Sequence, residues 1–516
     1  MKALPFKYPI TEKELRYQPD VLIGAFNQVL FFALVVAVFF LAARLFDKPT
    51  AWLSAALLFG ADIMWRFSIA GISTILLLLI LTGVVWCLVL IEETVREGNR
   101  GLVSLIVLSL FLGLACGLGA LTRYSFGWLI IPVGIFLLLL PSRVFLLPGA
   151  QQLGHEIGVP SRPVILSVTV IIFLLLTVPW VIRNYHLSGT PFGTSSYFIY
   201  DGTSHFPENH LDRSLQPEFP PANTLWFKEV LAQKVFKNSR QIIEHDLWRL
   251  GGGFIAMFFF ASLLIPLNNT GASRLRLFLI GTLAILILAQ AIGRTHLSDD
   301  SPDINTENLL VLLAPFVIIY GVQFFWLLLG QIYLPFRELR YAVIAGFCII
   351  ACLPLIFSFL PPKPSPLVYP PYFPPYIQKA ASFVKQDELT MCDIPWAMAW
   401  YGNVPSILLT QGSDAYASID EFQKPINELY FTQLTINRPF LTEWMQPSDN
   451  AWGNLFLQCS ATINEAADPL WPKEVRYQVK RINAPASSLP LNYFQQGWPQ
   501  ECLLTSRKNP ITPESK

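Results

Sequence analysis

Apolar stretches of helix-spanning length fill the first 360 residues of this 516-residue chain, and they constrain its fold more than any other feature. Most contain close to the ~20 apolar residues that a helix needs to cross about 30 Å of hydrocarbon. The stretches are Val21–Arg44, Trp52–Trp65, Ile69–Ile91, Leu102–Leu121, Phe126–Leu147, Pro163–Ile182, Phe254–Leu267, Leu275–Ile292, Leu309–Ile332 and Tyr341–Leu360. Trp52–Trp65 and Phe254–Leu267 are short and need a thinned bilayer or support from neighbouring helices. The pattern predicts a polytopic α-helical membrane protein with about ten transmembrane helices.

Basic residues between these stretches fall almost entirely in alternate loops. One set of loops carries Arg44, Lys48, Arg96, Arg100, Arg143, Arg162, Arg274, Arg276, Arg337 and Arg340. The other set carries only Arg66, Arg123, Arg183 and Arg294 close to the apolar stretches. Because Lys and Arg concentrate in cytoplasmic loops, we expect the first set to face the cytoplasm and the second to face the outside of the cell (inner) membrane.

The sequence predicts four parts along the chain. Residues 1–20 are expected to be the remnant of an outer loop, and 21–360 to form the transmembrane helical domain with a long outer loop at 184–250. Residues 361–375 hold eight prolines (PPKPSPLVYPPYFPP) and predict a stiff linker. Residues 376–516 are mixed in polarity, and their alternating helical and strand patterns favour a small extracytoplasmic α/β domain.

The C-terminal domain opens with four short predicted elements: a helix over 376–385, a strand over 389–392, a helix over 396–401 and a strand over 406–410. Its segment Met391–Asn403 (MCDIPWAMAWYGN) sets three aromatic rings beside one Asp. We interpret these rings as core or as a boundary with the membrane part, rather than as a binding loop. Cys392, Cys459 and Cys502 lack metal-ligand spacing, and any disulfide pairing among them stays open.

The N-terminal residues contain no signal peptide, because Met1–Asp20 has no apolar core. An outer N-terminus therefore requires either that the first span inserts unaided or that a further helix precedes it. We favour the second interpretation.

Charge and motif content exclude several classes of function. The net charge of +1 gives no sign of nucleic-acid binding, and only 14% of residues are charged, against about 25% in a typical soluble domain. The chain contains no G-x-x-x-x-G-K-[ST], so ATP-driven transport is unsupported. It also lacks H-E-x-x-H and G-x-S-x-G.

Polar residues on the outer rim are the first candidates for a functional site, because polar groups at membrane depth are costly. Three guanidiniums, those of Arg66, Arg123 and Arg183, each stand beside an aromatic ring, and Tyr124 and Asn184 follow two of them. Arg has a planar fork that suits phosphate oxygens, so these residues are candidates for binding a polyprenyl phosphate or pyrophosphate. The alternative is that each Arg only anchors a helix end by reaching the lipid phosphates.

The loop between the eighth and ninth stretches adds further polar candidates. Arg294 and His296 are proposed phosphate contacts, and His296 and Glu307 could also transfer protons. The loop is rich in carboxylates (Asp299, Asp300, Asp303 and Glu307). They could hold a divalent cation, but without an EF-hand spacing we favour a solvated acidic turn. Before this loop, the amphipathic segment 225–249 predicts a helix lying in the membrane interface.

Four segments resemble the GT-C superfamily of integral-membrane glycosyltransferases, in the branch of protein O-mannosyltransferases and aminoarabinose transferases. They are LAARLFDKPTAWLSAALLF (Leu41–Phe59), WRFS around Arg66, GLGALTRYS (Gly117–Ser125) and VPWVIRNYHLSGTPFG (Val178–Gly193). The resemblance implies an inverting enzyme that transfers a sugar from a polyprenyl-phosphate donor to a lipid, glycan or protein acceptor. It implies no cofactor firmly, and a divalent cation stays open.

The chain departs from that family at the catalytic acid. In the family this Asp lies in the first outer loop, whereas Met1–Asp20 offers only Glu12, Glu14 and Asp20, without an acidic pair. Asp20 is equally explained as a helix N-terminal residue that the macrodipole stabilises. The catalytic base is therefore left unassigned. The alternative function is a non-catalytic polyprenyl-lipid-binding or flippase-type protein that uses the same arginines.

Overall fold

The computed structural model describes residues 9–10, 17–97, 102–141, 144–146, 158–207, 209–219, 226–265, 269–300, 303–360, 373–432, 491, 493–494 and 502–511. Several residues named above lie outside these ranges, among them Glu12, Glu14, Arg100, Arg143, Cys459 and most of the proline-rich segment. The chain divides into two compact units. The membrane unit comprises 22–208 and 220–363, and the C-terminal unit comprises 1–21, 209–219 and 364–516. Part of the long loop, 209–219, thus belongs to the C-terminal unit.

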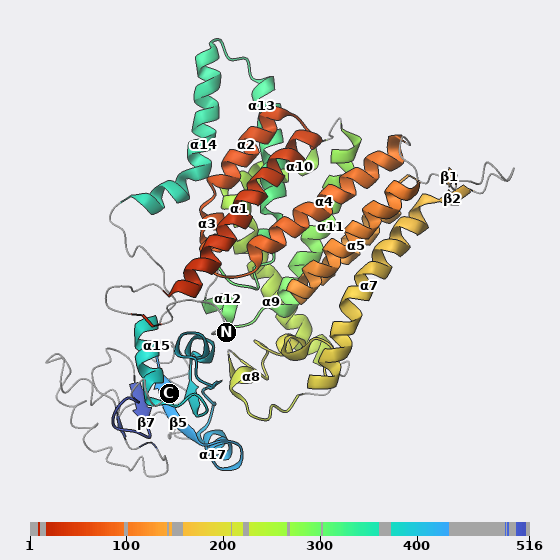
Figure 1. Ribbon diagram of the computed structural model, residues 1–516. Coiled ribbons are helices and arrows are strands. Elements are labelled where there is room, and N and C mark those ends of the chain that lie inside the picture. The colour runs from red at the N-terminus through yellow and green to blue at the C-terminus, as the bar shows by residue number, and fades with distance from the viewer. Residues whose placement is uncertain are drawn as a thin grey trace. The chain divides into compact units, whose positions relative to one another are not determined.

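Seven helices are long and apolar enough to cross a membrane, and each runs through one of the expected stretches (Figure 1). They are α1 (Gln18–Leu45), α4 (Thr74–Glu97), α5 (Leu102–Thr122), α7 (Ser161–Ser188), α11 (Thr270–Gly293), α13 (Ala314–Gln331) and α14 (Arg337–Phe359). A helix pair with a sharp bend gives an eighth crossing if it is counted as one span. The polytopic helical class is confirmed.

Two of the ten expected stretches are broken in the structure. Trp52–Trp65 becomes two short helices, α2 (Lys48–Phe59) and α3 (Asp62–Ile69). The break falls at Gly60, where a Cβ would lie 2.3 Å from Sγ of Cys352 in α14, so a side chain there would force Cys352 to shift. The stretch from Phe126 becomes a 3₁₀ turn, η1 (Tyr124–Leu129), and α6 (Ile130–Leu138). Strands β1 (Val144–Leu146) and β2 (Gly158–Pro160) then pair antiparallel.

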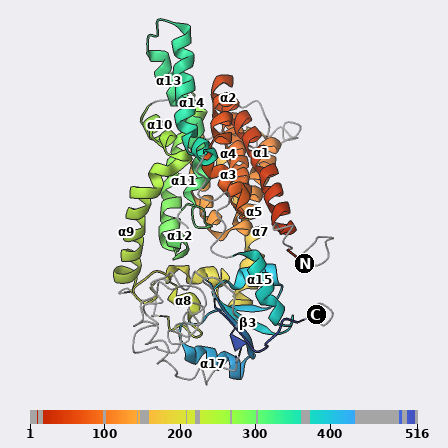
Figure 2. The same ribbon diagram turned by 90° about the vertical axis from the view of Figure 1, so that its left-hand side faces the viewer.

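A bent helix pair contains most of the other short stretch, Phe254–Leu267. The helical arm Glu229–Gly252, which contains α9 (Ala232–Gln241), meets α10 (Phe254–Leu264) at an angle of 101°. Three consecutive glycines at the bend, residues 251–253, all have positive φ, which glycine adopts at little cost. The amphipathic segment is therefore helical, as its periodicity predicts, and α9 runs alongside α11 (Figure 2).

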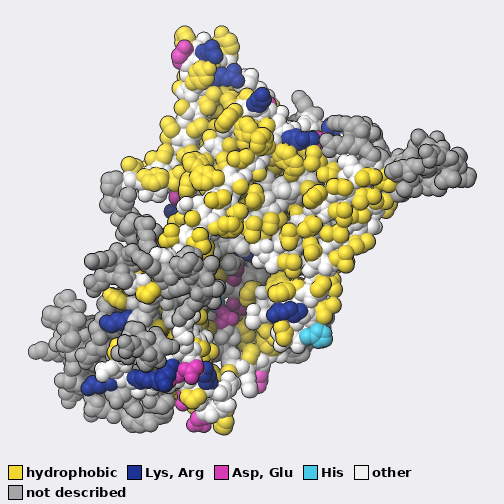
Figure 3. Space-filling model, viewed as in Figure 1, with side chains coloured by type: hydrophobic (Ala, Val, Ile, Leu, Met, Phe, Trp, Pro, Cys, Tyr) yellow, Lys and Arg dark blue, Asp and Glu magenta, His cyan; other side chains and the backbone are white. Residues whose placement is uncertain are grey.

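The surface of the membrane unit is covered with apolar side chains, drawn yellow over the helices in Figure 3. Large residues such as Phe26 on α1, Leu175 on α7 and Phe357 on α14 are more than half exposed. A soluble protein seldom exposes so large an apolar surface, so these faces suit contact with lipid.

The two sets of basic residues lie at opposite ends of α4. At its C-terminal end, Arg44 pairs with Glu93 at 2.5 Å and Arg274 pairs with the buried Glu92 at 2.9 Å. At its N-terminal end, the side chains of Ser73 and Thr74 accept hydrogen bonds from Arg123. Arg44 and Arg274 of the first set thus lie at the opposite end of α4 from Arg123 of the second set.

The C-terminal unit is built on a mixed sheet with the strand order β4-β3-β5-β7-β6. Strands β3 (Leu389–Cys392), β4 (Ser406–Leu408) and β5 (Ile426–Phe431) are parallel, whereas β7 (Cys502–Thr505) runs antiparallel to β5 and β6 (Tyr493–Phe494). Helices α15 (Pro374–Ala380), α16 (Pro395–Ala397) and α17 (Ser413–Phe422) connect or flank the strands. The α/β class is confirmed, and β3 has the bounds that the sequence predicts.

Candidate functional site

Arg123 ties three segments together at the polar end of the membrane unit. It directly follows α5, in an extended conformation that begins η1. Its Nη1 donates to the carbonyl oxygen of Thr306 at 2.7 Å, and its Nη2 to the hydroxyls of Ser73 and Thr74 at 3.1 and 3.2 Å. Burial lowers the pKa of Arg123 to about 10, so the guanidinium remains a cation at neutral pH. Arg123 therefore clamps the loop before α13 onto the start of α4.

Tyr124 joins the end of α5 to the end of α7. Its hydroxyl accepts hydrogen bonds from Nε1 of Trp180 and Nδ2 of Asn184, both at 2.7 Å. The guanidinium of Arg183 lies over the ring of Trp180, 4.6 Å from its centroid, and its Nη1 is 3.5 Å from Oδ1 of Asn184. Arg183 is thus an exposed cation supported by an indole ring and an amide rather than by a carboxylate.

Arg66 lies on α3 and pairs with Asp62 at 2.7 Å, one helical turn earlier, while about half of its side chain stays exposed. Arg66, Arg123 and Arg183 therefore have three different sets of partners. Tyr124 directly follows Arg123, and its hydroxyl accepts a hydrogen bond from Asn184, the residue after Arg183. It therefore links Arg123 to the surroundings of Arg183. Within the described residues, no hydrogen bond or ion pair joins Arg66 to this connection.

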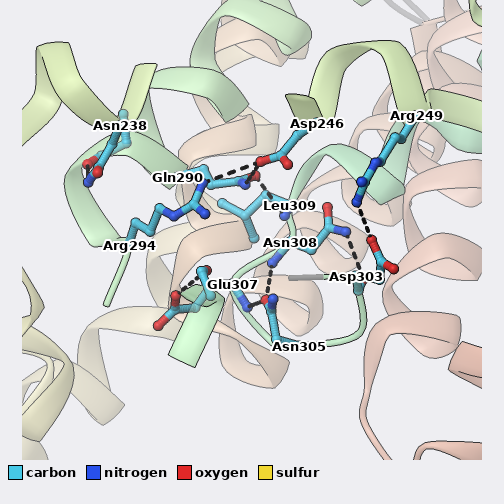
Figure 4. A network of polar contacts seen from close by, with 12 residues as sticks. Asn238, Asp246, Arg249, Gln290, Arg294, Asp303, Asn305, Glu307, Asn308 and Leu309 are labelled. Carbon is cyan, nitrogen blue, oxygen red and sulfur yellow. Dashed lines mark hydrogen bonds and ion pairs between the residues drawn. The ribbon is translucent and has the colours of Figure 1, made fainter. Parts of the chain in front are cut away.

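Arg294 is buried in a network that links the helical arm to α11 (Figure 4). Its Nη1 lies 3.5 Å from Oδ2 of Asp246, which also accepts a hydrogen bond from Gln290 at 3.3 Å. Gln290 in turn accepts a hydrogen bond from the backbone N–H of Leu309. Arg294, expected from the sequence to contact phosphate, thus faces a carboxylate and holds the arm in place.

A small pocket opens beside this network. Asp246, Arg249, Asp303 and Asn308 supply its polar lining, and Ile63 of α3 supplies part of its apolar lining. Arg249 and Asp303 form an ion pair across it at 2.6 Å. Arg66, three residues after Ile63 on the same helix, is not among the residues that line this pocket.

The acidic loop places its carboxylates on separate partners. Asp303 pairs with Arg249, whereas Glu307 accepts hydrogen bonds from the N–H and hydroxyl of Thr295 and from the hydroxyl of Ser298. The side chains of Asp299 and Asp300 lie outside the described residues. Asp303 and Glu307 therefore do not share one set of partners, as the ligands of a single cation would.

Two polar residues of this region were not singled out from the sequence as site residues. Lys234 of α9 is 5% exposed, and its ammonium donates hydrogen bonds to the carbonyl oxygens of Phe198 and Asp201. Burial lowers the pKa of Lys234 to about 8, although the carboxylates of Asp201 and Glu307 oppose this shift. Asp201 is buried as well, and its Oδ2 lies 3.5 Å from Nδ1 of His296. The only sequence signal is the Asp-Gly pair at 201–202, which indicates a turn.

Asp20, a remaining acid of the N-terminal segment, is fully engaged within the C-terminal unit. Its two carboxylate oxygens accept hydrogen bonds from Nε1 of Trp400 and the hydroxyl of Tyr401, both at 2.8 Å. The ring of Tyr17 packs edge-on against Tyr401 at 5.1 Å. Asp20 therefore fastens the N-terminal segment to the aromatic segment of this unit, which fits a structural role.

Comparison with known proteins identifies the fold. No protein-family model matches the chain, and no curated protein sequence matches it. The archaeal oligosaccharyltransferase AglB from Archaeoglobus fulgidus, solved with an inhibitory peptide and a dolichol-phosphate, has a TM-score of 0.50 and 10% identity. The match covers 81% of this chain and 59% of that chain, so the protein spans little more than half the length of AglB.

ArnT from Cupriavidus metallidurans, solved bound to undecaprenyl phosphate, has a TM-score of 0.46 and 10% identity, over 97% of this chain and 86% of that chain. The likeness to AglB, together with the helical order described above, shows that this multi-pass membrane protein shares the fold of that oligosaccharyltransferase.

Proposed function

We propose that the protein is a membrane glycosyltransferase that transfers a sugar from a polyprenyl-phosphate donor to an extracytoplasmic lipid, glycan or protein acceptor. The observation that carries the proposal is the fold shared with AglB over 81% of this chain. AglB was solved with a polyprenyl phosphate and a peptide bound, which supports the same two classes of ligand here. Because fold alone does not fix a reaction, the chemistry of the polar end has to support it too.

Arg183 is the cation best placed for the donor phosphate. Its guanidinium is exposed and is held over Trp180, so its planar fork is available to phosphate oxygens. Tyr124 accepts hydrogen bonds from Trp180 and Asn184, which holds the indole ring and the amide beside Arg183 in place. Arg66 is a second candidate, although Asp62 competes for its guanidinium.

The reaction we propose is a single displacement at the anomeric carbon. The acceptor oxygen forms a bond to that carbon while the bond to the phosphate oxygen breaks. The electron pair of the broken bond stays on the lipid phosphate. A guanidinium aimed at that phosphate stabilises the transition state more than the ground state, because negative charge grows on the leaving oxygen.

The polar end of the membrane unit faces the outside of the cell membrane in this proposal. The opposite end carries Arg44, Arg96 and Arg274, which pair with carboxylates of α4. A higher density of Lys and Arg there favours that end as the cytoplasmic one. The C-terminal unit is likewise proposed to be extracytoplasmic.

The test is turnover by the purified full-length chain in proteoliposomes. The donors are undecaprenyl phosphate carrying ¹⁴C-labelled mannose, glucose or arabinose, with water and a cell-envelope extract as acceptors. We expect label to leave at least one lipid donor faster than in protein-free vesicles. Folded protein that binds undecaprenyl phosphate but turns over no donor would instead support the non-catalytic lipid-binding or flippase-type function.

A further inference from the structure

Asp201 is a buried carboxylate held in a rigid turn. Its side chain is 3% exposed, and its Oδ1 makes no hydrogen bond, while Oδ2 lies 3.5 Å from Nδ1 of His296. The carbonyl oxygen of Asp201 accepts a hydrogen bond from the buried ammonium of Lys234, and Thr203 closes the turn onto Tyr200. Burying a carboxylate costs free energy unless a neighbouring cation or hydrogen-bond donor offsets it, so the placement of Asp201 needs an explanation.

His296 stands in a second turn that is fixed on both sides. The carboxylate of Glu307 accepts hydrogen bonds from Thr295 and from Ser298, the residues before and two after the histidine (Figure 4 shows Glu307 and Arg294). A Cβ on Gly202 would lie 4.0 Å from the carbonyl oxygen of Arg294, so the two turns lie side by side. The histidine side chain is 23% exposed, so part of the ring reaches the surface.

Four other carboxylates of the membrane unit already have charged or hydrogen-bonding partners. Asp62, Asp246 and Asp303 face the guanidiniums of Arg66, Arg294 and Arg249, and Glu307 accepts three hydrogen bonds. In each, a carboxylate oxygen is already engaged by one of these partners. An imidazole, by contrast, has an ordinary pKa of about 6.5, which suits proton transfer near neutral pH.

We propose that His296 is the catalytic base for the acceptor hydroxyl and that Asp201 is its positioning residue. The neutral imidazole takes the hydroxyl proton as the acceptor oxygen bonds to the anomeric carbon and the phosphate leaves with its electron pair. The imidazolium that forms is stabilised by the carboxylate of Asp201, and its proton then passes to water. Lys234 and Glu307 hold the two turns so that the pair is assembled before substrate binds. This inference rests on the proposed function.

The experiment measures steady-state transfer and, separately, binding of undecaprenyl phosphate by tryptophan fluorescence in the full chain. We expect H296A to lower kcat about 10²–10⁴-fold, with KM and lipid binding within about threefold of wild type. Added imidazole is expected to restore part of the kcat of H296A, which a structural role would not allow. D201N is expected to lower kcat by a smaller factor than H296A, since it removes only the orienting charge. The matched control is H205A, at an exposed histidine of the neighbouring loop.

Each outcome separates the inference from the function on which it rests. Wild-type turnover with H296A within threefold of it overturns the base and leaves the transferase intact. No turnover by wild type overturns both. If H296A does not fold, H296Q is the second variant, because glutamine has a similar size and forms hydrogen bonds but cannot act as a base. A kcat near wild type for H296Q overturns the proposal. A further outcome is that wild-type turnover requires added Mn²⁺ and that H296A no longer responds to Mn²⁺. Asp201 and His296 would then be metal ligands, and the proposal of a catalytic base would be overturned.

Discussion

The partner of each arginine decides what that arginine can do. Arg123 is half-buried with three hydrogen bonds to loop and helix groups, and Arg294 is buried against Asp246, so both hold the fold together. Arg183 has a ring and an amide beside it and an exposed guanidinium. Of the arginines predicted at this rim, Arg123 and Arg294 therefore support the fold. Arg183 is exposed without a carboxylate partner, and Arg66 is exposed but paired with Asp62.

Replacing Arg183 by Ala is expected to weaken binding of undecaprenyl phosphate about tenfold, because one charge-assisted contact of about 1.4 kcal/mol is lost. Tryptophan fluorescence titration of the full chain measures this. The matched control is R337A, since Arg337 also stacks on an aromatic ring, 5.7 Å from the centroid of Tyr341 at the start of α14. Equal weakening in both variants would show that Arg183 is only an interfacial anchor.

A second prediction at this scale concerns pH and the C-terminal unit. Arg507 binds both carboxylate oxygens of Glu388, and Lys385 donates its N–H to one of them. The hydrogen bond from Arg507 is the main reason that the pKa of Glu388 lies below its ordinary value of 4.5. A depressed pKa stabilises the folded state above pH 4.5, and this stabilisation is lost as the pH falls through the lowered value.

We therefore expect E388Q to destabilise the sheet by about 1 kcal/mol at pH 7, a modest value because both side chains are partly exposed. The difference from wild type should vanish at the lowest pH. Hydrogen exchange of peptides covering β3 and β7, corrected for intrinsic rates, measures this. The control is E421Q, at an exposed position of α17, and a pH-independent difference would contradict the assignment.

At the scale of elements, apolar length could be read directly from the sequence, and the seven long helices follow from it. The division of Trp52–Trp65 could not be predicted, because Gly60 matters only through its approach to Cys352 of a distant helix. Strand β3 was predictable because its four apolar or β-branched residues stand between turn signals. What the local pattern misses at Gly60 is a contact between residues far apart in the chain.

The packing of α5 on α7 gives the prediction at this scale. A Cβ on Gly113 would lie 2.6 Å from the carbonyl oxygen of Thr169, and one on Gly117 2.6 Å from Cδ1 of Leu176. Small residues four apart allow such close approach of membrane helices. We expect G113V to lower stability by about 1–3 kcal/mol through overpacking. Because Tyr124 and Asn184 join the ends of these helices, G113V should also weaken undecaprenyl phosphate binding.

Thermal unfolding in detergent measures the effect on stability. The control is G83V in α4, where a Cβ on Gly83 meets no atom within 4 Å. A melting temperature for G113V equal to that of G83V would show that α5 and α7 tolerate a wider spacing.

At the scale of the whole molecule, the candidate site combines residues that the sequence singles out with residues that it does not. Arg183, Asn184 and Tyr124 stood out because they occupy helix ends beside aromatic residues. Asp201 and Lys234 did not stand out, since their significance comes from burial that no local pattern announces. A lysine on an amphipathic helix is usually solvated, and only the tertiary structure turns Lys234 toward two carbonyl oxygens.

The loop segment 209–219 belongs to the C-terminal unit and is expected to stabilise it. Arg213, in α8 (His210–Arg213), is 6% exposed, and its Nη1 lies 3.5 Å from the carbonyl oxygen of Leu409 just after β4. The N–H of Gln411 donates to the carbonyl oxygen of Arg213 at 3.1 Å. We expect R213A to destabilise this unit by about 1–3 kcal/mol, because a buried acceptor loses a charged donor.

Hydrogen exchange of the full-length chain can localise that loss. Peptides covering β4 and α17 should exchange faster in R213A, while peptides of α4 and α5 in the membrane unit should stay unchanged. The matched control is L215A, at an exposed position of the same segment, which is expected to leave β4 protected. Equal protection of β4 in R213A and wild type would mean that the segment passes the sheet without supporting it. Faster exchange in both variants would mean that the whole segment, rather than the contact of Arg213, carries the stabilisation.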